Sequence, residues 1–234
     1  MKKRFQKRRN LLLLTLLFLT PIYPGFSVSK IDDSHRRSPN DISAANQFAF
    51  AHNWYRKGNQ LYRWGKYIEA ITAYEKAIAI DPKLDLAINK KAWAYRELDD
   101  FTESLASFEE AIAINRHVAE HWYGKGTVLY HMGRYKKSLR AYNRALKIDP
   151  QSDISLAGKA WTLAKLEKYE EALEHFDQAI KINESSADYW TGKGWVLYKM
   201  GHFLEARKTL NESLNLDPRN SYTSRYLKLV MNKR

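Results

Sequence analysis

The sequence contains no cysteine, and it has only six prolines and ten glycines in 234 residues. The absence of cysteine excludes disulfides, thiolate metal sites and a catalytic thiol. The scarcity of proline and glycine argues against a loop-rich or all-β chain, and the residues that dominate instead favour helices. The sequence also lacks a glycine-rich phosphate loop, a nucleophile elbow and a His-Glu-x-x-His motif. We therefore predict a helical protein that is not an enzyme and uses neither a cofactor nor a metal ion.

Acidic residues are absent from the beginning of the chain. Residues 1–29 contain no aspartate or glutamate. Their six bases are Lys2, Lys3, Arg4, Lys7, Arg8 and Arg9. These six contribute to a formal net charge of +13, and the other 33 basic residues exceed the 26 acidic ones by only seven. The rest of the protein is thus mildly basic, and we do not expect a nucleic-acid partner.

The basic head is followed by the apolar run LLLLTLLFLT at residues 11–20 and by small residues near Ser27. This order is typical of a secretory signal. As a helix, residues 11–23 would span roughly 20 Å, which is shorter than the bilayer core of about 30 Å. We expect residues 1–29 to be a signal peptide that directs export to the periplasm, a lumen or the cell exterior. The alternative is an uncleaved signal anchor that holds the protein in a membrane through residues 11–23.

Nearly the same dozen residues occur three times at a fixed interval. The stretches are RKGNQLYRWGKY at 56–67, GKGTVLYHMGRY at 124–135 and GKGWVLYKMGHF at 192–203. Related stretches lie midway between them, so the period is 34 residues, and the alternation of two versions suggests that a pair of units was duplicated. We divide the chain after residue 29 into a polar linker with the start of the first helix (30–50), five units (51–84, 85–118, 119–152, 153–186 and 187–220) and a capping helix (221–234).

Small and aromatic residues occupy fixed places in each unit. Place 8 holds Gly58, Ala92, Gly126, Ala160 and Gly194, and place 24 holds Tyr74, Phe108, Tyr142, Phe176 and Leu210. Glycine at place 15 of the odd units suits a left-handed end of the first helix, and proline at place 32 stops the second. This 34-residue pattern resembles the tetratricopeptide repeat family. The resemblance implies an all-α fold, a right-handed superhelical solenoid of helix-turn-helix repeats in which neighbouring units bury each other's apolar faces.

The resemblance also implies where a partner binds. In this family the first helix of each unit lines the concave wall, and places 2, 5, 9, 12 and 13 usually face the ligand. Here these places are rich in tyrosine and tryptophan, which are effective binding anchors. The predicted partner-binding residues are Tyr55, Asn59, Tyr62, Trp93, Arg96, Tyr123, Tyr130, Trp161, Trp195 and Tyr198. Alternatively, the tryptophans only pack between adjacent helices.

These features predict a non-enzymatic scaffold for protein–protein interaction. We expect it to bind a peptide or protein segment, acidic or containing aromatic residues, during the assembly of an envelope or membrane complex. The runner-up is a module that binds a glycan or polyanion by ring stacking and by a ladder of lysines. That ladder occupies place 7 of every unit, at Lys57, Lys91, Lys125, Lys159 and Lys193. The other interpretation of the ladder is a set of packed stems whose ammonium groups pair with acids on neighbouring helices.

His117 and His121 are four residues apart, as metal ligands can be. His117 falls in the turn before the helix that holds His121, and no third ligand is near in the sequence. We therefore predict no metal site there.

Overall fold

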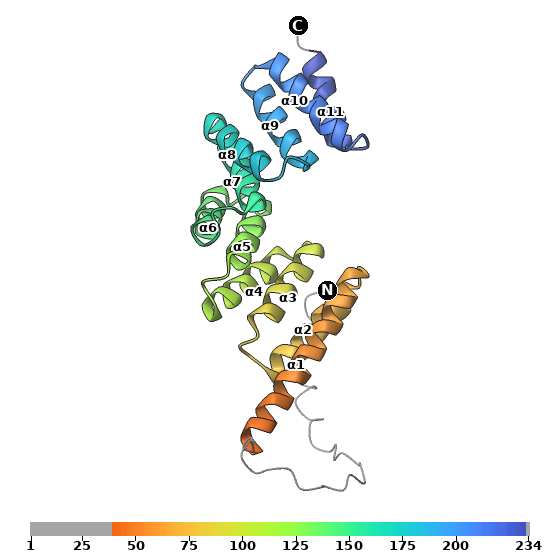
Figure 1. Ribbon diagram of the computed structural model, residues 1–234, viewed down its shortest axis with the longest axis vertical. Coiled ribbons are helices and arrows are strands. Elements are labelled where there is room, and N and C mark those ends of the chain that lie inside the picture. Colours follow the sequence, from red (N-terminus) through yellow and green to blue (C-terminus); the bar gives the residue numbers. More distant parts are fainter. Residues whose placement is uncertain (1–38, 233–234) are drawn as a thin grey trace, which may run out of the picture. The chain divides into compact units, whose positions relative to one another are not determined.

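The computed structural model describes residues 39–232, and their side chains from residue 47 onward. The predicted signal or anchor segment and most of the polar linker lie outside the described residues. All regular secondary structure in the described part is α-helical, which confirms the predicted fold class (Figure 1). The helices are α1 (Pro39–Arg63), α2 (Tyr67–Ile80), α3 (Asp85–Glu97), α4 (Phe101–Ile114), α5 (Ala119–His131), α6 (Tyr135–Ile148), α7 (Asp153–Lys165), α8 (Tyr169–Ile182), α9 (Ala187–Lys199), α10 (Phe203–Leu216) and α11 (Ser221–Met231).

The two helices of each unit are joined by a tight turn at place 15. Gly65, Gly133 and Gly201 occupy this place in the odd units, with φ angles of 71°, 71° and 85°. The structure thus confirms the left-handed glycines expected from the sequence. In the even units Asp99 and Glu167 adopt the same conformation, with φ angles of 56° and 61°. Because an L-residue costs roughly 1–2 kcal/mol in this region, the even-unit turns are strained relative to the odd ones.

Four of the five turns that follow a second helix begin with a side chain that binds the backbone. Oδ1 of Asp81, Asp149 and Asp217 accepts the N–H of the residue two positions later, at 3.0, 3.1 and 3.1 Å. A proline follows each aspartate and cannot continue the helix. Asn115 makes the same bond, at 3.2 Å, to the N–H of His117 without a following proline. The side-chain bond is therefore the feature that these turns share.

The large side chain at place 24 fills the space between two units. Tyr142 is 3% exposed and lies against Gly126 of its own unit and Gly158 of the next. A Cβ atom added to these glycines would lie 2.9 Å from Cε1 and 2.5 Å from Cζ of Tyr142. Glycine also occupies place 6 of the third and fifth units, where it receives the place-24 ring of the preceding unit. The sequence indicated the small residue at place 8 but not this second contact.

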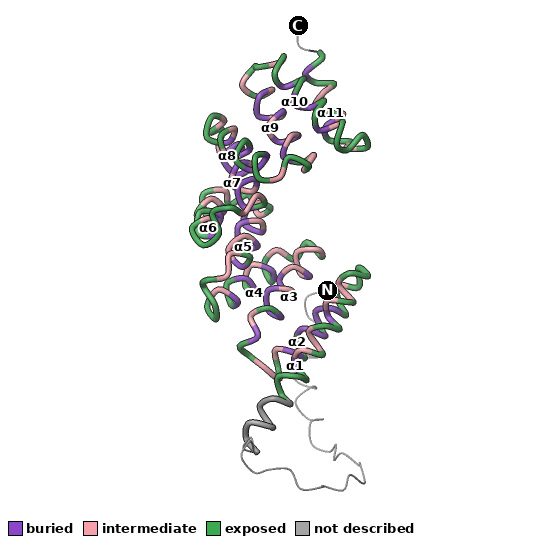
Figure 2. Tube along the Cα trace, in the orientation of Figure 1, coloured by how far each residue is buried: buried purple, intermediate pink, exposed green. Residues whose placement is uncertain are grey.

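The first helices of successive units form a row. Besides packing against its neighbours along the chain, α3 contacts α5, α5 contacts α7, α7 contacts α9 and α9 contacts α11. In Figure 1, α6 and α8 lie to the left of α5 and α7. Figure 2 shows buried residues in purple where neighbouring helices meet and exposed residues in green away from these contacts. The row of first helices is the surface that the sequence predicts to bind a partner.

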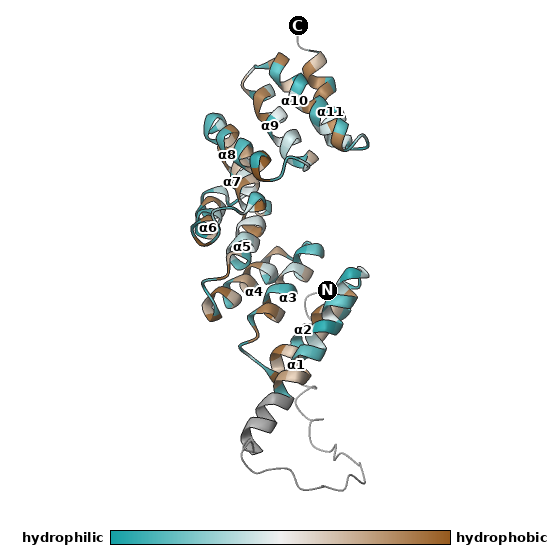
Figure 3. Cartoon of the chain, viewed as in Figure 1, coloured by the Kyte–Doolittle hydropathy of each residue, from teal (hydrophilic) through white to brown (hydrophobic). Residues whose placement is uncertain are grey.

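Each second helix has one apolar side and one polar side. In α6, for example, Ala141, Tyr142 and Ala145 are buried, whereas Arg140 and Arg144 are exposed. Figure 3 shows the same mixture of hydrophobic (brown) and hydrophilic (teal) residues along the helices. None of the helices within residues 39–232 is long and apolar enough to cross a membrane.

The last helix, α11, takes the position of a sixth first helix. Oδ1 of Asn220 accepts the N–H of Thr223 at 3.1 Å and so caps the helix at its N-terminus. The buried hydroxyl of Thr223 lies 2.6 Å from that of Thr191 and 3.2 Å from that of Ser213. Val230 is 3% exposed and completes the core around α9 and α10. α11 therefore closes the last repeat with both polar and apolar contacts.

Candidate functional site: an aromatic groove on the first helices

The row of first helices carries a groove with a volume of about 800 Å³, which we call the inner groove. Its walls come mainly from α3, α5, α7, α9 and α11, and one side chain comes from the second helix α6. Eight tyrosine and tryptophan side chains line it: Tyr123, Tyr130, Tyr142, Trp161, Tyr189, Trp195, Tyr222 and Tyr226. Aromatic surface is therefore the main chemical character of the groove.

The structure brings half of the predicted binding residues into this groove. Those that line it are Arg96, Tyr123, Tyr130, Trp161 and Trp195. Those that lie outside it are Tyr55, Asn59, Tyr62, Trp93 and Tyr198. All ten are partly buried, so each retains some surface for a partner. Their role in binding stays a prediction.

The tryptophans at place 9 are both packing residues and surface residues. Trp161 meets Phe176 edge to face, with ring centroids 5.4 Å apart, and lies 5.8 Å from Trp195. Trp93 meets Phe108 in the same way at 5.2 Å. The indoles of Trp93 and Trp161 thus cover the buried ring at place 24 of their own units while part of each indole stays exposed. The two interpretations of these residues are therefore compatible.

The predicted residues at the N-terminal end are engaged in contacts within the protein. The hydroxyl of Tyr62 donates to Oε1 of Glu97 at 3.1 Å. Oδ1 of Asn59 accepts the hydroxyl of Tyr74 at 2.8 Å, and the ring of Tyr55 lies 6.2 Å from that of Tyr74. These contacts fix the side chains in place and leave the amide NH₂ of Asn59 as its remaining hydrogen-bonding group.

The expectation that place 5 faces a ligand is wrong for Asn89, which is buried and does not line the groove, whereas Ala157 and Thr191 line it although little of either side chain is exposed. In α3, the amide of Asn89 donates to Nδ1 of His121 at 2.9 Å, and Nε2 of His121 donates to Oδ2 of Asp85 at 3.2 Å. In the second unit, place 5 is thus covered by the first helix of the next unit. His121 belongs to this buried network, and the described residues contain no group of three or more histidine or acidic side chains that could hold a metal ion.

Charges in and around the inner groove are few and partly offset. Arg96 forms an ion pair with Glu97, and its guanidinium carbon lies 5.8 Å from the ring centroid of Trp93. At the other end, the ammonium groups of Lys165 and Lys199 each lie 5.9 Å from the ring centroid of Trp195. This distance allows a cation–π interaction. Lys165 lines the groove and Lys199 lies beside the same indole outside the lining, an arrangement that suits a carboxylate next to an apolar group.

Four titratable side chains of the groove, Tyr123, Tyr130, Tyr142 and His131, are neutral near pH 7. Burial raises the pKa of Tyr130 to about 12 and raises the pKa of Tyr123 and of Tyr142 above the ordinary value. Burial, together with the nearby charge of Arg96, lowers the pKa of His131. The phenols therefore act as hydrogen-bonding groups on neutral rings, and His131 adds a positive charge only in acid.

Sequence reasoning missed the part of the groove that α11 and place 2 supply. Tyr222 and Tyr226 of α11 line the groove, as do Ile154 and Asp188. Ile154 and Asp188 hold place 2 of their units, and Tyr222 holds place 2 if the period continues into the predicted cap. The signal was therefore present, since place 2 is one of the places expected to face a ligand.

The lysine ladder at place 7 is largely neutralised by acids on second helices. Lys91 lies 3.9 Å from Glu110, and Lys125 lies 2.8 Å from Glu109. Lys193 forms a third such pair, at 2.5 Å from Asp177. Burial lowers the pKa of Lys159, partly against the attraction of Glu171 and Glu174. These contacts match the interpretation of packed stems with paired ammonium groups and argue against a free basic ladder for a polyanion.

Comparison with known protein families gives four matches to tetratricopeptide repeat models. Three are described as tetratricopeptide repeat, at residues 53–84, 89–153 and 187–220, and one as TPR repeat, at residues 162–201. Together they extend across the five repeated units. The chain belongs to the tetratricopeptide repeat family. No curated protein matches its sequence.

Solved structures of similar fold include three repeat proteins of low sequence identity. PilF of Pseudomonas aeruginosa superposes with a TM-score of 0.70 at 17% identity, covering 80% of this chain and 86% of its own. YrrB, described as a TPR protein with an unusual peptide-binding site, has a TM-score of 0.62 at 19% identity, covering 82% and 98%. TTC0263 of Thermus thermophilus has a TM-score of 0.65 at 19% identity, covering 77% and 99%. At these identities the likeness establishes the fold.

Proposed function

We propose that the protein is a non-enzymatic scaffold that holds a peptide or protein segment in the inner groove. The observation that carries the proposal is the lining of eight tyrosine and tryptophan side chains in a groove of about 800 Å³. Such rings bury a large apolar area at a small cost in side-chain entropy, and their polar atoms orient a ligand. YrrB, which has a similar fold, is described as having an unusual peptide-binding site, and this supports peptide binding as the function of a protein with this fold.

The chemistry of the groove selects the kind of segment. Neutral rings dominate, so an aromatic or aliphatic side chain of the partner would supply most of the contact area. The ammonium groups of Lys165 and Lys199 beside Trp195 would pair with a carboxylate at one end. We therefore propose a partner segment that combines an apolar or aromatic anchor with an acidic residue or a terminal carboxylate.

The N-terminal sequence supports a proposal for the cellular setting of this interaction. An apolar run behind a basic head at residues 1–23 is typical of export or membrane anchoring. We propose that the scaffold acts outside the cytoplasmic leaflet, in the assembly of an envelope or membrane complex. Export and groove binding are separate proposals, because either can fail without affecting the other.

Selection of random peptides displayed on phage tests the groove directly. Ile154 and Tyr222 line the groove but are 45% and 66% exposed, so replacing them disturbs little packing. We expect the selected peptides to bind the wild-type protein and to lose roughly tenfold or more in affinity for the variant I154R/Y222A. The matched control is I68A/L204A, which changes residues that are 68% and 77% exposed on second helices. Equal binding to all three proteins would contradict the proposal.

A further inference from the structure

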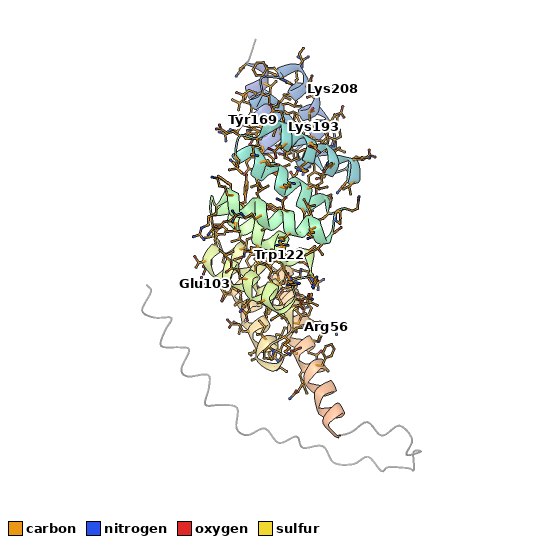
Figure 4. The ribbon with its side chains drawn as sticks, turned by 90° about the vertical axis from the view of Figure 1, so that its left-hand side faces the viewer. Arg56, Glu103, Trp122, Tyr169, Lys193 and Lys208 are labelled. Carbon is orange, nitrogen blue, oxygen red and sulfur yellow. The ribbon has the colours of Figure 1, made fainter. Side chains whose placement is uncertain are left out.

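A second groove lies on the surface formed by the second helices, between α4 and α6. We call it the outer groove. Its volume is about 810 Å³, and its floor is formed by α5 with Trp122 and Leu129. Figure 4 looks toward the side of the second helices and labels Trp122 within this surface. Five exposed bases surround the groove: Arg134, Lys137, Arg140, Arg144 and Lys147. The outer groove therefore has an apolar floor and a basic rim.

The basic rim comes from an unusual helix. α6 and the residue before it contain six bases and no acid, whereas α2, α4, α8 and α10 all contain acidic residues. Within the described residues, none of the five rim bases forms an ion pair. Lys125, which also lines the groove, is paired with Glu109. The rim thus carries concentrated positive charge that the fold itself leaves unneutralised.

The 68-residue repeat of the sequence provides a control for this feature. Sixty-eight residues later, the groove between α8 and α10 has the same floor, with Trp190 and the pair of Lys193 with Asp177. Its rim differs, because Glu205 and Glu212 stand where the outer groove has Lys137 and Arg144. The shared floor is therefore part of the repeat, whereas the bases of α6 are not required by the fold. Charge at the rim is the property that distinguishes the two grooves.

We propose that the outer groove is a second binding site, for an acidic amphipathic segment of a partner protein. Lys137, Arg140, Arg144 and Lys147 recur at spacings of three and four residues, which places them along one side of α6 over roughly 15 Å. A helix or extended peptide of that length with several carboxylates would match this stripe. The apolar floor favours such a segment over a nucleic acid, because leucine and tryptophan beneath the bases can bury an apolar side chain of the peptide.

The probe for the test is a fluorescein-labelled synthetic peptide in which glutamates and leucines alternate at helical spacing. We expect binding to the wild-type protein that weakens as salt rises. The variant K137E/R144E gives the outer groove the acidic residues of its counterpart, and we expect it to lose at least roughly tenfold in affinity. The reciprocal variant E205K/E212R should gain a second site and raise the stoichiometry. Each variant introduces residues of the charge that the equivalent positions of the other groove already carry, so we expect both variants to fold.

Two controls separate this site from general attraction to a basic protein and from the inner groove. K83E/K136E changes the net charge by the same amount at exposed lysines that do not line the outer groove, and we expect it to bind the peptide as the wild type does. The salt-sensitive binding that K137E/R144E loses should persist in I154R/Y222A, because that variant alters the inner groove only. Absence of binding by the wild type, equal weakening by K83E/K136E, or tighter binding of a single-stranded oligonucleotide than of the peptide would each overturn the proposal.

Discussion

Glu167 lies in the left-handed turn of the fourth unit, and its replacement by glycine should stabilise the protein. Its φ angle is 61°, whereas glycine holds the equivalent place in the third and fifth units at 71° and 85°. The left-handed conformation costs an L-residue roughly 1–2 kcal/mol, and glycine loses roughly 0.5–1 kcal/mol more backbone entropy on folding. The difference predicts that E167G raises the free energy of unfolding by about 0.5–1 kcal/mol. Glu167 is exposed and forms no ion pair within the described residues, so no side-chain contact is lost.

The reverse change at Gly133 tests the same reasoning with the opposite sign. A Cβ atom added there would meet nothing within 4 Å, so the cost of G133A is purely conformational. We expect G133A to lower the free energy of unfolding by about 1 kcal/mol. E167A is the matched control, because it shortens the side chain without relieving the turn and should leave stability nearly unchanged.

Urea denaturation followed by circular dichroism measures all three variants. For a domain of this size, a change of about 1 kcal/mol also shifts the melting temperature by roughly 2–4 °C. The reasoning would be refuted if E167G were neutral or destabilising while G133A lost stability, because the two turns would then differ in more than backbone strain.

The remaining predictions concern packing, buried hydroxyls and pH. G158A should cost roughly 1–3 kcal/mol in urea denaturation, because its Cβ would lie 2.5 Å from the ring of Tyr142. T223V should cost roughly 0.5–1.5 kcal/mol by removing the buried hydrogen bonds of the Thr223 hydroxyl with Thr191 and Ser213, and hydrogen exchange should quicken in α11. Partial burial lowers the pKa of His131 and of His175 in the folded protein. The unfolded chain therefore takes up protons at these histidines at a higher pH than the folded protein does. The free energy of unfolding should therefore fall as pH drops through about 6.5 and level off below the folded pKa values, and H131Q/H175Q should flatten that decline. A decline of equal size in H131Q/H175Q would contradict the assignment.

The sequence predicted the helices and their small and aromatic contacts well because these depend on spacing along one hairpin. Gly126 and Tyr142 share a unit, and their 16-residue separation was enough to predict that they meet. The contact of Tyr142 with Gly158 depends on how the next hairpin is placed, which no spacing within a unit determines. For the same reason, Asn89 was expected to face a ligand but is buried under α5.

The extent of the binding surface was also beyond sequence reasoning. Tyr222 and Tyr226 complete the inner groove because α11 continues the row of first helices, whereas the sequence identified that segment only as a cap. The outer groove combines Leu105 of α4, Trp122 of α5 and Arg144 of α6. The outer groove could be identified only once the packing of these three helices was known. The bases of α6 alone would have predicted only a solvent-exposed helix face.

The central claim is that the inner groove holds a partner segment, and site-specific photo-crosslinking in the source cells tests it most directly. A photoreactive phenylalanine analogue at Ile154 lies in the groove, and the same group at Leu204 of α10 lies outside both grooves. We predict that the Ile154 position crosslinks to one segment of a partner protein and that a peptide selected for groove binding competes with this product. Identical products from both positions, or a crosslink at Ile154 that no such peptide reduces, would contradict the claim.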